Sequence, residues 1–230
     1  MPGPHDRGWS LVVCAASGPS FTVEQAAIVE SARAAGRCHV IAVNTTGLPP
    51  KPPDRPVGLP MADVLYAADA KWWTTHHAEA RAHCAGEFWT ASADPAKSYG
   101  LRHIVANKGD GLSWRLDQLH KGGNSGYQAI GLAYLFGASR IVLVGYDLQR
   151  EGGQENGRKH HHGDHPAGLH NTAEAAYAKW IPRFTPLARD LAAAGVEVVN
   201  CSPGTALRCF AMGDLADALE RWPAEQLEVV

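Results

Sequence analysis

The residues in this chain best suited to chemistry are a glycine-rich segment, 122–126, and the acid Asp147 that follows it. A loop of this kind leaves backbone N–H groups free at a helix N-terminus, where the helix dipole favours a phosphate. Three glycines in five residues exceed what a helix cap needs, and they let the backbone approach a ligand closely. We therefore expect Asn124, Ser125 and Gly126 to contact a nucleotide-type ligand, with Ser125 as the N-cap.

A second candidate is the histidine-rich segment, about 149–170, which we expect to be a lid loop. Histidine titrates near neutral pH, so His162, His165 or His170 is a candidate general base. The same segment contains the donor set of a zinc or iron site. That alternative would use His160, His162, Asp164 and His165. A solvated loop without a function is the third interpretation.

Apolar runs alternate with helical patterns along the chain, and these elements must position both candidates. We predict strands at 9–15, 38–43, 62–67, 87–91, 102–106, 141–144 and 196–200. We predict helices at 22–35, 69–86, 125–138, 172–194 and 212–221. Pro182 and Pro186 are expected to break the fourth of these helices into two. The alternation favours an α/β fold, with a mostly parallel sheet and helices on both faces, as one domain over 1–230.

Polar or glycine-rich residues follow several of the predicted strands. They are Gly18, Pro19 and Ser20 after the first strand, Asn44 after the second, Asp69 after the third, and Tyr146 and Asp147 after the run at 141–144. Because the carboxyl ends of parallel strands meet at one edge of a sheet, where open α/β folds bind ligands, these residues are expected to share a site. The alternative is that they are only turn formers.

Composition bounds the remaining functions. The formal net charge of the 230 residues is −2, so salt-driven binding to a nucleic acid is not indicated. The five cysteines form no C-x-x-C pair, which favours a reducing cytoplasm. No apolar run approaches the length of a membrane span. We therefore expect a cytoplasmic protein; homo-oligomerisation stays open.

The order of these motifs resembles the bacterial sialyltransferases of glycosyltransferase family 42 and their uncharacterised phage relatives. Archaeal pterin diphosphokinase-like proteins share part of the pattern. The segments that carry the resemblance are 16–20, 43–44, 125–127, 143–147 and 199–207, within a span of about 10–210. The resemblance implies a Rossmann-like sheet that binds a cytidine nucleotide-sugar at its carboxyl edge. It also implies an inverting transfer without a metal or another cofactor.

The resemblance assigns roles to individual residues. Gly18, Pro19 and Ser20 would line the first loop, and Asn44, Ser125 and Gly126 would contact the nucleotide. A lid histidine would take the proton of the acceptor. His170 is the nearest match to that base, and His165 and His162 are its competitors.

The chain departs from the family at two places. The family usually has asparagine at the position of Ser17, and a phosphate-binding tyrosine at the position of Gln149. Leaving-group stabilisation would then use Arg158, Lys159 or a histidine. The substrate or lid set is Asp69, Tyr146, Gln149, Arg158 and Lys159.

The sequence therefore predicts an enzyme that transfers a group from a nucleotide-activated, cytidine-type donor to a hydroxyl acceptor, the acceptor itself being unassigned. Three alternatives stay open. They are a diphosphokinase-like transferase on the same fold, a nucleotide-binding module without catalysis, and a metal-dependent hydrolase that uses the histidines.

Overall fold

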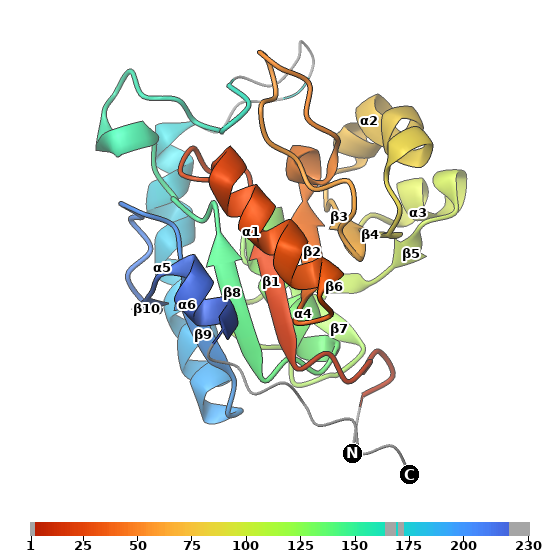
Figure 1. Cartoon of the computed structure of the whole chain (residues 1–230). Helices are drawn as coiled ribbons and strands as arrows, with labels where there is room; N and C mark the ends of the chain where they lie inside the picture. Colours follow the sequence, from red (N-terminus) through yellow and green to blue (C-terminus); the bar gives the residue numbers. More distant parts are fainter. Residues whose placement is uncertain (1–2, 164–168, 170–172, 221–230) are drawn as a thin grey trace.

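The computed structural model describes residues 3–163, 169 and 173–220, and its centre is an eight-stranded sheet whose paired strands all run parallel (Figure 1). The strand order is β10-β9-β8-β1-β2-β3-β4-β5. The strands are β1 (Leu11–Ala15), β2 (His39–Val43), β3 (Val64–Tyr66), β4 (Glu87–Thr90), β5 (Arg102–His103), β8 (Arg140–Val144), β9 (Glu197–Asn200) and β10 (Ala211–Met212). Continuous burial of β1 and β8 is what a strand covered on both faces requires.

The chain changes direction across the sheet at β1. Val13 of β1 pairs with Val40 of β2 on one side and with Val142 of β8 on the other. From β1 the chain runs outward through β2, β3, β4 and β5, and from β8 it runs the opposite way through β9 to β10. The carboxyl ends of β1 and β8 therefore form a topological switch point, the place where open α/β sheets bind ligands.

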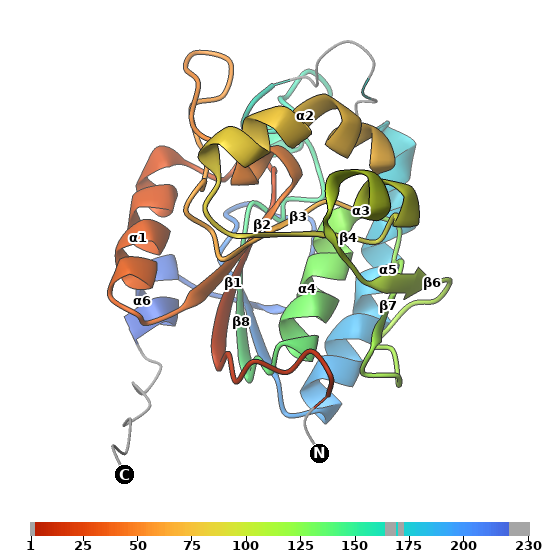
Figure 2. The ribbon, with the colours of Figure 1, turned by 90° about the vertical axis from the view of Figure 1, so that its right-hand side faces the viewer.

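Helices cover both faces of the sheet (Figure 2). On one face, α1 (Val23–Ala34) and α6 (Leu215–Glu220) pack on Leu11, Val13 and Ala15. On the other face, α4 (Ser125–Leu135) and α5 (Glu174–Ala193) pack on Val12 and Cys14. Alternate residues of β1 thus supply the two cores. This arrangement confirms the predicted α/β, Rossmann-like fold.

A third apolar cluster lies beyond β3 and β4. It is built by α2 (Ala70–His83) and α3 (Ala93–Tyr99), with Trp72 and Trp73 as its largest members. Leu169, from the histidine-rich segment, packs against the same cluster. A described residue of that segment is therefore held near the carboxyl edge of the sheet.

The predicted strand at 102–106 is two strands. Arg102 and His103 form β5 at the edge of the main sheet, whereas β6 (Val105–Asn107) leaves it and pairs with β7 (Gln118–His120). Neither β7 nor α3 was predicted. Two short 3₁₀ helices, η1 (Asn44–Gly47) and η2 (Glu151–Gly153), follow β2 and β8.

The predicted break in the helix at 172–194 is wrong, because α5 is continuous with Pro182 and Pro186 inside it. Its apolar face, which includes Phe184, Leu187 and Leu191, is buried against the sheet. Pro182 itself is exposed, so its ring meets no tertiary neighbour that would force the helix apart. Packing of an amphipathic face stabilises a helix more than local propensity does, and here it outweighs the missing N–H groups.

No described helix combines the length and the apolar character that crossing a membrane would require.

Candidate functional site

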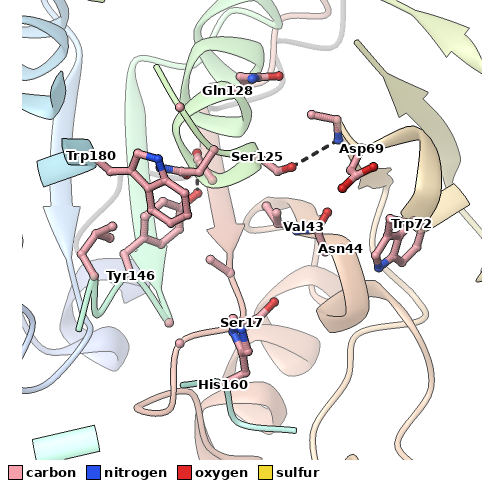
Figure 3. Close-up of a pocket in the computed structure, with 18 of the residues that line it drawn as sticks. Ser17, Val43, Asn44, Asp69, Trp72, Ser125, Gln128, Tyr146, His160 and Trp180 are labelled. Carbon is pink, nitrogen blue, oxygen red and sulfur yellow. Dashed lines mark hydrogen bonds between the residues drawn. The ribbon is translucent and has the colours of Figure 1, made fainter. Parts of the chain in front are cut away.

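The switch point holds a pocket of about 510 Å³ (Figure 3). Its wall is made by the segments that follow β1, β2, β3, β4 and β8, together with the first turn of α4 and part of α5. This volume is in the range of small-molecule and cofactor sites. Most of the residues predicted at the strand ends are therefore brought to one place by the parallel sheet.

The first turn of α4 faces the pocket. Asn124, not the predicted Ser125, is its N-cap, and the Asn124 Oδ1 accepts the Tyr127 N–H at 2.8 Å. The Ser125 hydroxyl instead accepts the N–H of Ala68 at 3.2 Å, which ties α4 to the segment after β3 (Figure 3). The N–H groups of Ser125 and Gly126 lie in the first turn, where the helix supplies no acceptor. They are available to an anion in the pocket.

The glycine-rich loop before α4 is shaped by its contacts with aromatic rings. Gly122 and Gly123 have φ values of 54° and 102°, which favour glycine. A β-carbon on Gly123 would lie 2.5 Å from Trp180 Cδ1. The loop thus comes close to α5, and Trp180 and Tyr177 of that helix line the pocket.

The loop after β1 contacts the end of β8 directly. A β-carbon on Gly18 would overlap the Asp147 carboxylate and the Gly145 carbonyl. The Asp147 carboxylate accepts the hydroxyl of Ser20 at 2.9 Å and its N–H at 3.2 Å. Gly18 and Asp147 line the pocket, whereas Pro19 and Ser20 lie behind them. Ser20 therefore acts on the site through Asp147.

Burial raises the pKa of Asp147 to about 6, against the opposing effect of its hydrogen bonds from Ser20. Tyr146, the residue before it, is fully buried, and its hydroxyl donates to the Gly126 carbonyl at 3.0 Å. The end of β8 and the start of α4 are thus joined by a hydrogen bond across the pocket wall.

The segments after β2 and β3 supply amide and carboxylate groups. Asn44 has a φ of 52°, and its Oδ1 is buried without a hydrogen bond to any described residue. The Nδ2 of Asn124 is likewise buried and has no hydrogen-bond partner among the described residues. Asp69 is the N-cap of α2, where its carboxylate accepts the Lys71 N–H at 2.8 Å. Asn44, Asn124 and Asp69 all line the pocket, although the two unsatisfied amide atoms are themselves buried.

Of the histidine-rich segment, Lys159 and His160 line the pocket. His162 is buried and does not, but its ring stacks on that of His160 with centroids 5.0 Å apart. The other predicted bases, His165 and His170, and the metal candidate Asp164 lie outside the described residues. Within the described part of the chain, no group of three or more histidine, cysteine, aspartate or glutamate side chains could hold a metal.

Two further residues of the predicted set, Gln149 and Arg158, differ in whether they border the pocket. Gln149 lines the pocket, and its amide donates to the Gly204 carbonyl. Arg158 does not line it, because its guanidinium pairs with Glu151 at 2.6 Å and 2.8 Å. Of the neighbouring cations Arg158 and Lys159, only Lys159 therefore lines the pocket.

Sequence reasoning missed several lining residues. Lys121 directly precedes the glycine-rich loop, and its position beside a predicted phosphate site was an available signal. Gln128, one turn into α4, accepts a hydrogen bond from the Tyr66 hydroxyl and donates to the Lys121 carbonyl at 2.9 Å. Trp180 belongs to a helix that follows the histidine-rich segment, and no local pattern in its sequence indicated the pocket.

No family model matches the chain, and no curated protein and no solved structure matches it either. The fold and the site together define a Rossmann-like α/β protein with a ligand pocket at the switch point of a parallel sheet.

Proposed function

We propose that the protein binds a nucleotide-activated donor in this pocket and transfers its group to a hydroxyl acceptor. The observation that carries the proposal is the meeting of the α4 N-terminus, Lys121 and Lys159 in a pocket at the switch point of the sheet. Backbone N–H groups, a helix dipole and lysines together favour a phosphate.

Charge in the pocket supports this assignment. Neither Lys121 nor Lys159 forms an ion pair with a described carboxylate, so both charges are available to a ligand. Two carboxylates, Asp69 and Asp147, also line the pocket, and with a pKa of about 6 Asp147 is still mostly ionised at pH 7. A phosphate is therefore expected beside the two lysines and the first-turn N–H groups of α4, which supply its cationic and donor partners.

Asn44 supports a nucleobase as part of the ligand. An asparagine amide offers both an acceptor and two donors, which matches the edge of a nucleobase. Asn44 lines the pocket, so a nucleobase bound there would lie beside this residue. Cytidine remains the proposed nucleoside because of the family resemblance.

We assign the acceptor proton to His160, because it is a described histidine that lines the same pocket as the phosphate site. A base must lie within hydrogen-bond reach of the proton that it removes. The stacked ring of His162 restricts the orientation of His160. No cofactor has a role in this proposal.

Calorimetric titration and thermal shift with CMP, CDP, UDP, GDP and ATP test the binding step, with and without a chelator. Stabilisation by a cytidine nucleotide that is unaffected by chelator is expected. Lys121→Met and Lys159→Met should each weaken nucleotide binding about threefold to tenfold, whereas Lys97→Met, on exposed α3, should not.

Hydrolysis of a CMP-activated sugar, with water as the acceptor, tests the transfer step. Release of CMP that depends on His160 supports a transferase. Binding without any turnover would favour the nucleotide-binding module, and diphosphate transfer from ATP would favour the diphosphokinase-like reaction. Loss of activity on chelation would favour the metal-dependent hydrolase.

A further inference from the structure

A chain of hydrogen bonds leads from the pocket into the core through Ser17, Thr46 and His161. The Thr46 Oγ1 lies 3.2 Å from the Ser17 Oγ and 3.1 Å from the His161 Nε2. The backbone N–H of His161 also donates to the Ser17 carbonyl at 3.0 Å. The three residues come from the end of β1, from η1 and from the histidine-rich segment, so the chain joins three elements at the pocket floor.

Only Ser17 of these three reaches the pocket, where it lies near His160 in the view of Figure 3. Thr46 is fully buried, and His161 is 3% exposed. The ring of Phe21 closes one side of His161, with centroids 5.9 Å apart. Neither Thr46 nor His161 can therefore meet a ligand, and any effect they have on one passes through Ser17.

His161 is neutral near neutral pH. Burial lowers the pKa of its imidazole to about 3, and neighbouring His160, Arg55 and Arg158 act in the same direction. A neutral imidazole carries a proton on one nitrogen and a lone pair on the other, so the ring can donate only one hydrogen bond. The position of that proton determines which group donates in each hydrogen bond of the series from His161 through Thr46 to Ser17.

The Nδ1 of His161 is buried and has no hydrogen-bond partner among the described residues. A buried N–H without an acceptor is rarer and costlier than an unused lone pair. The proton therefore belongs on Nε2, which donates to the Thr46 Oγ1. The Thr46 hydroxyl then donates to the Ser17 Oγ, and the Ser17 proton is left for the pocket.

We infer that this chain fixes Ser17 as a hydrogen-bond donor to a phosphate oxygen of the ligand, with Thr46 and His161 as positioning residues. The inference rests on the proposed function and deepens it. A serine hydroxyl can otherwise donate or accept, but one that already accepts from Thr46 favours an oxyanion as its own partner. Hydrogen bonds in series also polarise one another, which strengthens the last donor.

The direction of the chain is tested without any ligand. Two-dimensional NMR that correlates the ring nitrogens and carbon-bound protons of the histidines distinguishes the two tautomers. His161 should give the signals of an Nε2–H imidazole with an unprotonated Nδ1. An Nδ1–H tautomer, or a doubly protonated ring at pH 7, would overturn the inference.

Ligand binding tests the function of the chain. Calorimetry compares CMP with cytidine, which lacks the phosphate. Ser17→Ala should weaken CMP about 10- to 100-fold, and Thr46→Val about threefold to tenfold, with cytidine affinity unchanged. In the Ser17→Ala background, Thr46→Val should cause no further loss. Equal losses for CMP and cytidine, or additive losses in the double variant, would contradict a chain that acts through Ser17.

Thr46→Ser serves as the conservative variant, because it keeps the hydroxyl and should retain the CMP affinity that Thr46→Val loses. If it behaves like Thr46→Val, a packing defect explains both variants and the inference is wrong. If the wild-type protein binds no nucleotide, the proposed function fails by itself. Titration with inorganic phosphate and pyrophosphate then tests the role of the hydrogen bonds through Ser17, Thr46 and His161. Ser17→Ala and Thr46→Val should each bind both anions more weakly than the wild type.

Discussion

The Asp147 carboxylate accepts two hydrogen bonds from one residue, Ser20, through its hydroxyl at 2.9 Å and its backbone N–H at 3.2 Å. Ser20 lies in the loop between β1 and α1, and Asp147 lies in the segment after β8. Their hydrogen bonds therefore join the two halves of the sheet at the switch point. The carboxylate is 5% exposed. Asp147 therefore forms its hydrogen bonds mainly within the protein, although the residue also lines the pocket.

Asp147→Asn should change how stability depends on pH. The pKa of Asp147 is raised from 3.8 to about 6, so the folded protein holds this proton more tightly than the unfolded chain does. The resulting stability is fully present below pH 4 and is lost as the pH rises through 6. It amounts to up to about 3 kcal/mol.

Urea denaturation at pH 4 and pH 7 measures this effect. From pH 4 to pH 7 the wild type loses the contribution of Asp147 to its free energy of unfolding, and Asp147→Asn does not. The free energy of unfolding of the variant should therefore fall less, or rise more, over this change. Asp63, whose pKa is lowered to about 2, acts at lower pH and in the opposite sense, so it does not confound the comparison. Identical pH profiles for variant and wild type would show that Asp147 is not desolvated in solution.

Gly18→Ala should destabilise the protein. The added methyl group would overlap the Asp147 carboxylate and the Gly145 carbonyl, and neither can move without breaking contacts at the switch point. Overpacking of this kind costs about 1–3 kcal/mol. Gly36→Ala is the control: its added β-carbon would meet no atom within 4 Å, so the variant carries only the strain of a φ of +69°.

The measurement is the denaturation midpoint in urea for both glycine variants. The expected order of stability is wild type, then Gly36→Ala, then Gly18→Ala. Nucleotide binding should weaken in Gly18→Ala alone, because only this residue borders the pocket. A Gly18→Ala protein as stable as Gly36→Ala would mean that the two loops are further apart than the structure places them.

Two replacements of Asn44 separate its backbone role from its side-chain role. Its φ of 52° lies in the left-handed region, which glycine and asparagine tolerate and alanine does not. Asn44→Ala should therefore lose about 1 kcal/mol of stability more than Asn44→Gly. Both should weaken nucleotide binding about tenfold, because both remove the amide. Thermal denaturation and calorimetry give the two readouts; affinity lost only in Asn44→Ala would assign the effect to the backbone.

Much of the fold was predictable because buried parallel strands leave a strong signal. Runs such as 141–144 are apolar throughout, and most of the polar residues that follow such strands line one pocket, Pro19 and Ser20 excepted. The short strands β6 and β7 leave no such signal, since three residues are too few to show a period.

The site was predictable only where it is local in sequence. The first turn of α4 follows from its glycines, but the cap fell on Asn124 because Ser125 is used by Ala68, a contact 57 residues away. Trp180 reaches the pocket through the packing of α5. Which histidine of the long histidine-rich segment lines the pocket depends on the course of that segment in space, so the spacing of the histidines did not identify His160.

Pro182→Ala should stabilise the protein. The substitution restores an N–H opposite the Ala178 carbonyl in the interior of α5, and it removes the clash of the ring with that carbonyl. Because Pro182 is exposed, no packing is lost. An increase of about 1 kcal/mol or more in the free energy of unfolding is expected, with Lys179→Ala as a nearly neutral control on the same helix. A destabilised Pro182→Ala would mean that the helix relies on the proline.

His160→Ala tests the assignment of the base. Loss of a general base lowers turnover by about 10²- to 10⁴-fold, so CMP release from a CMP-activated sugar should fall by that factor while CMP affinity changes much less. His162→Ala should have an intermediate effect, because the stacked ring at 5.0 Å only orients His160. His83→Ala, an exposed histidine in the last turn of α2, is the control and should match the wild type. Full turnover in His160→Ala, with loss in His165→Ala or His170→Ala, would move the base to a residue beyond His160.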